Sequence, residues 1–142
     1  MYSMDSQREW WKGDTNLKQK KSVEDYLKVI YILSKKKEVH GVDIARELRV
    51  SRPTVSVALK ALAEEGYIFV DDTYEIHLTI KGRRVAEDTY ERHDTFRRLL
   101  MSLGVDEKTA EADACEMEHA VSPASYEALK MLAEKQKESV QI

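Results

Sequence analysis

Residues 41–66 read GVDIARELRVSRPTVSVALKALAEEG, and two apolar stripes at helical spacing run through them. Ser51 stands between the stripes as a candidate N-cap, and Pro53 falls in a first turn, where proline is tolerated. Gly66 can end the second helix because glycine readily adopts the left-handed conformation found there. The stretch therefore predicts two short helices joined by a tight turn, a helix-turn-helix. The stripes are Val42, Ala45 and Leu48 in the first helix and Val55, Leu59 and Leu62 in the second.

Residues 67–79, YIFVDDTYEIHLT, follow at once and alternate between apolar and other side chains on both sides of a polar turn at 71–73. This pattern predicts a β-hairpin with about four residues in each strand. A helix-turn-helix followed directly by a hairpin is a winged helix. The alternating residues are Ile68 and Val70 before the turn and Ile76 and Leu78 after it.

The rest of the chain carries helix signals, each with a capping residue at its start. Gly104 separates two of these helices. The predicted helices are residues 22–36 with Ser22 as N-cap, a long helix from Thr79 to about Leu100, residues 107–120 with Asp106 as N-cap, and a last helix from Ser122-Pro123 to about Lys137.

The predicted fold class is therefore mainly α, with a winged helix-turn-helix DNA-binding domain followed by an all-helical dimerisation and metal-binding domain. We expect a polar N-terminal tail at 1–21, the first domain at 22–80 and the second at 81–142. Trp10 and Trp11 in the tail allow two interpretations, loose packing on the body or contact with a partner or DNA. We favour the first.

The composition limits the class of protein. The chain has 142 residues, 42% hydrophobic and 35% charged, and no apolar run approaches the ~20 residues of a membrane span. The N-terminus lacks a secretion signal, and Cys115 is the single cysteine, which suits a reducing cytoplasm. Glycine-rich nucleotide-binding motifs are absent from the sequence. We therefore expect a cytoplasmic protein that is not an enzyme, with neither a membrane partner nor a small-molecule substrate.

The charge distribution suits a protein that contacts DNA phosphates through residues 1–100. The net charge is +2 over residues 1–100 and −5 over residues 101–142. A recognition helix presents its N-terminal residues to base edges in the major groove, so the second helix of the pair predicts DNA binding. The alternative to DNA binding is a helical pair whose polar face is merely solvated. The hairpin that follows the pair favours DNA binding. The predicted DNA-binding residues are Ser51, Arg52, Pro53, Thr54, Ser56 and Lys60.

Cys115, Glu118 and His119 read C-x-x-E-H and share one face of a predicted helix. A thiolate, a carboxylate and an imidazole on one face can bind a transition metal. The spacing alone also fits a solvated Glu-His pair beside a core cysteine. Asp25 and His93, each on a separate predicted helix, can complete the ligand set, which favours the metal interpretation.

Five segments in order carry a resemblance to a known family: SVEDYLKVIYIL, VSRPTVSVALKALAEEGYI, HLTIKGRRVA, RHDTFRRLL and DACEMEHAVS. They resemble the diphtheria toxin repressor family of metal-activated bacterial repressors over roughly residues 22–135. No third, SH3-like domain follows, so the sequence looks like the short manganese transport regulator branch. The resemblance implies a homodimer that binds a palindromic DNA operator through its winged helices and holds metal in its C-terminal helices.

Position by position, the resemblance assigns metal-ligand roles to the five residues named above. Asp25 matches a ligand that is aspartate in the manganese branch, and His93 matches the histidine of the connecting helix. Glu118 and His119 match a carboxylate–imidazole pair. Cys115 falls where the iron branch has cysteine and the manganese branch glutamate, and this position can also act through its backbone carbonyl.

Three departures from the family pattern concern a second metal. Lys28 stands where manganese-type members carry a further glutamate ligand, and Glu111 and Arg97 replace ancillary ligands of the iron branch. We therefore expect one metal site, with the Lys28 ammonium in the space of a second cation. Fe(II) or Mn(II) is the expected ion, with a slight preference for iron; Co(II) or Zn(II) can substitute.

The sequence thus predicts a metal-dependent transcriptional repressor of metal-ion homeostasis. The main alternative is a metal-independent winged-helix regulator, for which the ligand set would be coincidental. A small metallohydrolase would leave the winged helix unexplained, and a structural zinc site would rarely use so many carboxylate ligands.

Overall fold

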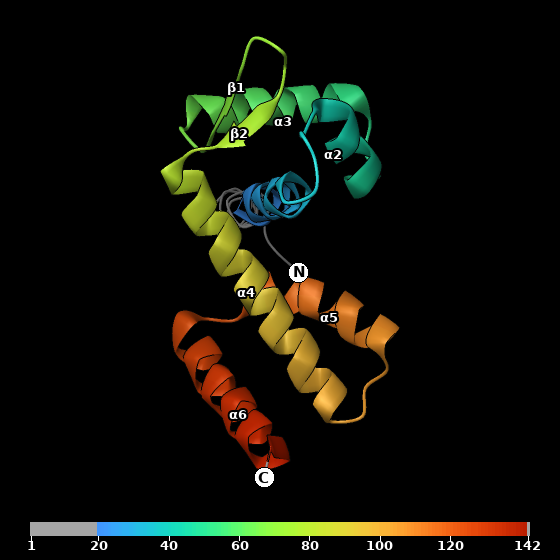
Figure 1. Ribbon diagram of the computed structural model, residues 1–142, viewed down its shortest axis with the longest axis vertical. Coiled ribbons are helices and arrows are strands. Elements are labelled where there is room, and N and C mark those ends of the chain that lie inside the picture. The colour runs from blue at the N-terminus through green and yellow to red at the C-terminus, as the bar shows by residue number, and fades with distance from the viewer. Residues whose placement is uncertain (1–19, 142) are drawn as a thin grey trace, which may run out of the picture. The chain divides into compact units, whose positions relative to one another are not determined.

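The computed structural model describes residues 20–141, with side chains up to residue 136. The chain divides into two compact units between Glu87 and Asp88. The predicted fold class, mainly α with a winged helix-turn-helix, is confirmed. The elements are a helix at 20–34, α2 (Gly41–Leu48), α3 (Arg52–Glu64), β1 (Ile68–Val70), β2 (Ile76–Leu78), α4 (Ile80–Ser102), α5 (Glu107–Ala120) and α6 (Pro123–Gln141) (Figure 1).

The helix-turn-helix forms with the predicted signals. Ser51 is the N-cap of α3, and its Oγ accepts a hydrogen bond from the backbone N–H of Thr54 at 3.2 Å. Pro53 lies in the first turn, and Gly66 follows the helix with φ of 82°. The core of this unit joins α2 and α3 to the helix at 20–34. Its most deeply buried side chains include Leu27, Ile30, Ile44 and Val55.

Two helix predictions for this unit need correction. Ser22 is not an N-cap, because Lys20 and Lys21, both good helix formers, are already helical. Val42 is 40% exposed, and Ile44 is the residue of α2 that is fully buried. The apolar face of this short helix is thus rotated relative to the predicted stripe. Trp10 and Trp11 lie outside the described residues.

A buried carboxylate organises the start of α2. Asp43 is 8% exposed, and its Oδ1 accepts a hydrogen bond from Nζ of Lys37 at 2.6 Å. Its Oδ2 accepts from the backbone N–H of His40, the N-cap of α2, at 2.9 Å. The hydrogen bond from Lys37 is the main reason that the pKa of Asp43 lies below its ordinary value of 3.8.

We expect Asp43→Asn to lower the free energy of unfolding by about 1–2 kcal/mol at neutral pH, because the charge-assisted bond to Lys37 is lost. A carboxyl whose pKa is lowered on folding stabilises the protein above its ordinary pKa, and this contribution disappears as the pH falls through the folded value. The difference between wild type and variant, measured by urea unfolding, should therefore shrink below about pH 4. Asp72→Asn, at the exposed wing tip, is the control. A difference that grows as the pH falls would contradict the assignment.

The wing is an antiparallel pair beside α3, with Ile68 opposite Leu78 (Figure 1). Its strands have three residues each, shorter than predicted, because the turn extends to Glu75. Asp71 explains the longer turn: its Oδ1 accepts backbone N–H bonds from Thr73 and Glu75 at 2.9 and 3.0 Å. His77 contacts its other oxygen at 2.9 Å and is the main cause of a lowered Asp71 pKa.

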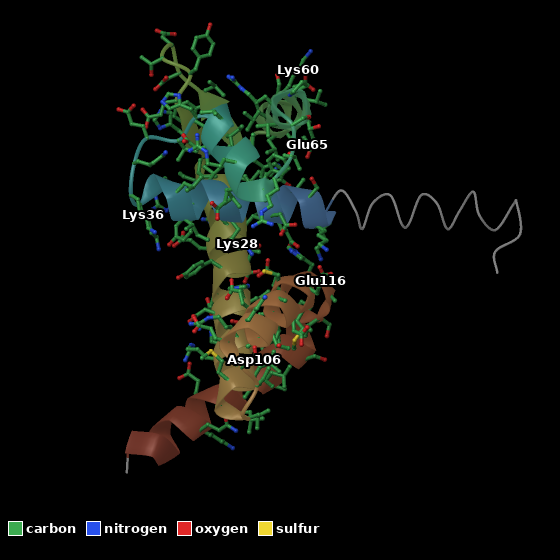
Figure 2. The ribbon with its side chains drawn as sticks, turned by 90° about the vertical axis from the view of Figure 1, so that its right-hand side faces the viewer. Lys28, Lys36, Lys60, Glu65, Asp106 and Glu116 are labelled. Atoms are coloured by element: carbon green, nitrogen blue, oxygen red, sulfur yellow. The ribbon has the colours of Figure 1, made fainter. Side chains whose placement is uncertain are left out.

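The second unit packs the C-terminal part of α4 with α5 and α6. Phe96 and Tyr126 meet edge to face, with ring centroids 5.7 Å apart, and Ala114 is buried between partly buried neighbours. The predicted N-cap Asp106, labelled in Figure 2, accepts the backbone N–H of Thr109 at 3.0 Å. Among the described residues, the structure has no helix with both the length and the apolar character needed to cross a membrane.

Candidate metal centre

Four of the five predicted ligands lie together inside the second unit. Nδ1 of His93 is 3.0 Å from Oε2 of Glu118 and 3.7 Å from Sγ of Cys115. The other oxygen of Glu118 is 3.1 Å from Nε2 of His119. This chain of contacts joins two imidazoles, a carboxylate and a thiol, which are donor types that bind transition metals.

The helices account for the convergence. Cys115, Glu118 and His119 occupy positions i, i+3 and i+4 of α5, so their side chains share one face. His93 lies on α4, which packs on that face through the cluster around Phe96. The side chain of Glu118 is fully buried, and that of His119 is 7% exposed. A carboxylate buried this deeply is costly unless charged or polar groups surround it, as the imidazoles do here.

Asp25, the fifth predicted ligand, lies on the helix at 20–34, in the unit that ends at Glu87. Its participation stays a prediction.

Glu111, which replaces an ancillary ligand of the iron branch, also lies at the cluster. Its Oε1 is 3.0 Å from Nε2 of His93, on the opposite side of the ring from Glu118. Ligand atoms of His93, Glu111 and Cys115 lie within 4.8 Å of one another. The other oxygen of Glu111 is 3.9 Å from Nε of Arg97. The helical spacing of Glu111 four residues before Cys115 is the signal that places it on the same face.

Of the six predicted DNA-binding residues, Ser51 is the N-cap of α3 and four lie in its first two turns, while Lys60 lies one turn further along the helix. Their side chains are exposed, and Lys60 is labelled on α3 in Figure 2. The hydroxyls of Ser51 and Thr54 are 2.7 Å apart, so one of their two hydrogens is used between them. The exposed set is Ser51, Arg52, Pro53, Thr54, Ser56 and Lys60.

Val57 belongs to the same surface and was missed by the sequence reasoning. It is 72% exposed, three residues after Thr54 and three before Lys60. An aliphatic side chain on a recognition helix can contact the methyl group of thymine. The spacing from Thr54 is the available signal, although apolar residues of a helix are usually buried.

A winged helix followed by a helical unit with a largely buried cluster of nitrogen, oxygen and sulfur donors defines a class: DNA-binding regulators that respond to metal ions. The family described as iron dependent repressor, N-terminal DNA binding domain, matches residues 19–73. The iron dependent repressor, metal binding and dimerisation domain, matches residues 79–140.

Individual relatives extend over most of the chain. An uncharacterised HTH-type transcriptional regulator of Methanocaldococcus jannaschii is 36% identical over 122 residues, 84% of this chain and 98% of that protein. The transcriptional regulator MntR of Escherichia coli O157:H7 is 36% identical over 114 residues, 80% of this chain and 74% of its own. The solved structure of the manganese regulator SloR superposes with a TM-score of 0.71 at 32% identity, covering 79% of this chain. This chain spans about half of that structure, 53% of its length.

The chain belongs to the iron-dependent repressor family of metal-dependent, DNA-binding transcriptional regulators. The resemblance to the diphtheria toxin repressor family is thereby confirmed.

Proposed function

We propose that this chain is a repressor of metal-ion homeostasis genes that binds a palindromic operator when loaded with Fe(II) or Mn(II). The observation that supports it most is the cluster of His93, Cys115, Glu118 and His119, with Glu118 fully buried, in a chain whose first unit is a winged helix. The residues fit an ion because two imidazoles and a carboxylate suit Mn(II) and Fe(II), while the thiol tilts the preference towards iron. Co(II) and Zn(II) are expected substitutes.

We assign the ion to Nδ1 of His93 together with Cys115, Glu118, His119 and Asp25. A metal-bound histidine commonly donates its other ring N–H to a carboxylate, which fixes the orientation of the ring. Glu111 lies 3.0 Å from Nε2 and is suited to that role. In this assignment Glu111 orients His93 without binding the ion.

When bound, the ion would supply a positive charge to which ligands from both proposed domains could coordinate. Asp25 comes from the DNA-binding domain, proposed at 22–80, and the other ligands from the dimerisation and metal-binding domain, proposed at 81–142. Joining them restricts the freedom of the two winged helices of a homodimer and favours the spacing that matches the two operator half-sites. The proposed role is repression in the cytoplasm, and it requires no catalysis by the protein.

The direct test is operator binding with and without metal. Operators selected from random duplex DNA by the Mn(II)-loaded protein are titrated in Mn(II), in Fe(II) under anaerobic conditions, and in chelator. We expect affinity to rise about 5–150-fold with the ion, the usual range of coupling between two sites. Equal affinity in metal and chelator would point to the metal-independent regulator and end the proposal.

We also expect one tight Mn(II) or Fe(II) ion per subunit. Lys28 lies three residues after Asp25 on the same helix, and its ammonium replaces the carboxylate that a second ion would need. Calorimetric titration of metal-free protein gives the stoichiometry. Two tight ions per subunit would refute the single-site assignment.

A further inference from the structure

Arg92 precedes the proposed ligand His93 on α4 and points its guanidinium at the end of α5. Its side chain is 12% exposed. Nη1 donates to the carbonyl oxygen of Val121 at 2.6 Å and, at 3.4 Å, to that of Glu118. The guanidinium carbon lies 4.8 Å from the ring centroid of Tyr126 on α6. One side chain of α4 therefore contacts both α6 and the carbonyl end of α5.

The end of α5 needs such a partner. The last carbonyl groups of a helix lack intrahelical hydrogen bonds, and they form the negative end of the helix dipole. A largely buried arginine satisfies both the hydrogen-bonding and the charge requirement. On this helix the last turn carries two proposed ligands, Glu118 and His119, because α5 ends at Ala120. Arg92 thus binds the same turn of backbone that sets the orientation of the Glu118 and His119 side chains.

We propose that Arg92 is a positioning residue of the metal centre: by binding the carbonyl end of α5 it holds Glu118 and His119 towards His93 without contacting the ion. The proposal rests on the metal-binding role proposed above. Tyr126 supports it, since the ring limits where the guanidinium can lie. Nε of Arg92 is 3.6 Å from Oδ2 of Asp88, which adds a further restraint along α4.

The test compares two arginine-to-methionine variants of the same helix. Arg92→Met keeps an unbranched apolar stem beside Tyr126 but removes the donors to α5. Arg98→Met is the matched control, because Arg98 is 45% exposed and pairs with Asp94 on α4 itself. Co(II) is the probe, and its dissociation constant and visible absorption spectrum are measured together with thermal unfolding of each metal-free protein.

We expect Arg92→Met to weaken Co(II) binding about 10–100-fold, the usual cost of losing a group that orients ligands, and to change the Co(II) spectrum. Arg98→Met should keep wild-type affinity and spectrum. Arg92→Lys retains one donor for Val121 and should recover part of the affinity. A purely structural role predicts an unchanged spectrum in every folded variant.

Wild-type affinity and spectrum in Arg92→Met would overturn the positioning role while leaving the metal site intact. If Arg92→Met does not fold, Arg92→Lys decides: weakened Co(II) binding at unchanged metal-free stability supports the proposal, and unchanged binding overturns it. Failure of the wild-type protein to bind Co(II) would instead overturn the proposed metal site, and this inference with it.

Discussion

Glu118→Gln is expected to remove the metal-dependent rise in operator affinity while the protein stays folded. The carboxylate of Glu118 contacts both imidazoles of the cluster, at 3.0 Å from His93 and 3.1 Å from His119. Glutamine has nearly the same volume, so the fully buried position is filled, but a neutral amide is a weak ligand for Fe(II) or Mn(II). The expected loss is the whole coupling free energy, about 1–3 kcal/mol.

The measurement is operator affinity by fluorescence anisotropy, in Mn(II) and in chelator, for the wild type and the variant. Glu116→Gln is the control, because Glu116 lies on the same helix two residues earlier and is exposed (Figure 2). It should respond to Mn(II) like the wild type. Circular dichroism of both metal-free variants checks the fold. A wild-type metal response in Glu118→Gln would exclude Glu118 from the site.

Much of the fold could be predicted because its signals are local. Ser51 and Asp106 cap α3 and α5 as expected. Each side chain accepts a hydrogen bond from the backbone N–H three residues later, so the cap does not depend on distant parts of the chain. The cluster of Cys115, Glu118 and His119 was equally local, because helical spacing alone puts these residues on one face.

What escaped prediction depends on contacts between distant segments. Ile44 is buried in place of Val42 because the packing of α2 on its neighbours decides which face turns inward. The five-residue wing turn depends on the side chain of Asp71, which accepts backbone hydrogen bonds from Thr73 and Glu75. The turn motif in the sequence does not reveal these bonds. Arg92 gave no sequence signal, since its partner carbonyl at Val121 is 29 residues away.

Gly82→Ala should destabilise the first unit strongly. A Cβ built at Gly82 meets the carbonyl oxygen of Tyr67 at 2.0 Å, and this neighbour is backbone. That oxygen already accepts the backbone N–H of Thr79 at 3.0 Å and its hydroxyl at 3.1 Å. Relief of the clash therefore requires the start of α4 to move away from the wing and to lose these bonds.

We expect the free energy of unfolding to fall by about 3 kcal/mol or more, the upper range for added atoms in tight packing. The gain from replacing glycine by alanine within a helix, about 1 kcal/mol, offsets only part of this. Gly41→Ala is the matched control, because a Cβ there meets side-chain carbons of Leu59 and Val55 at an ordinary 3.8 Å. Urea unfolding followed by circular dichroism should separate the two variants clearly. Equal free energies of unfolding for the two variants would contradict the prediction, because they would show that the start of α4 can move away from Tyr67 at little cost.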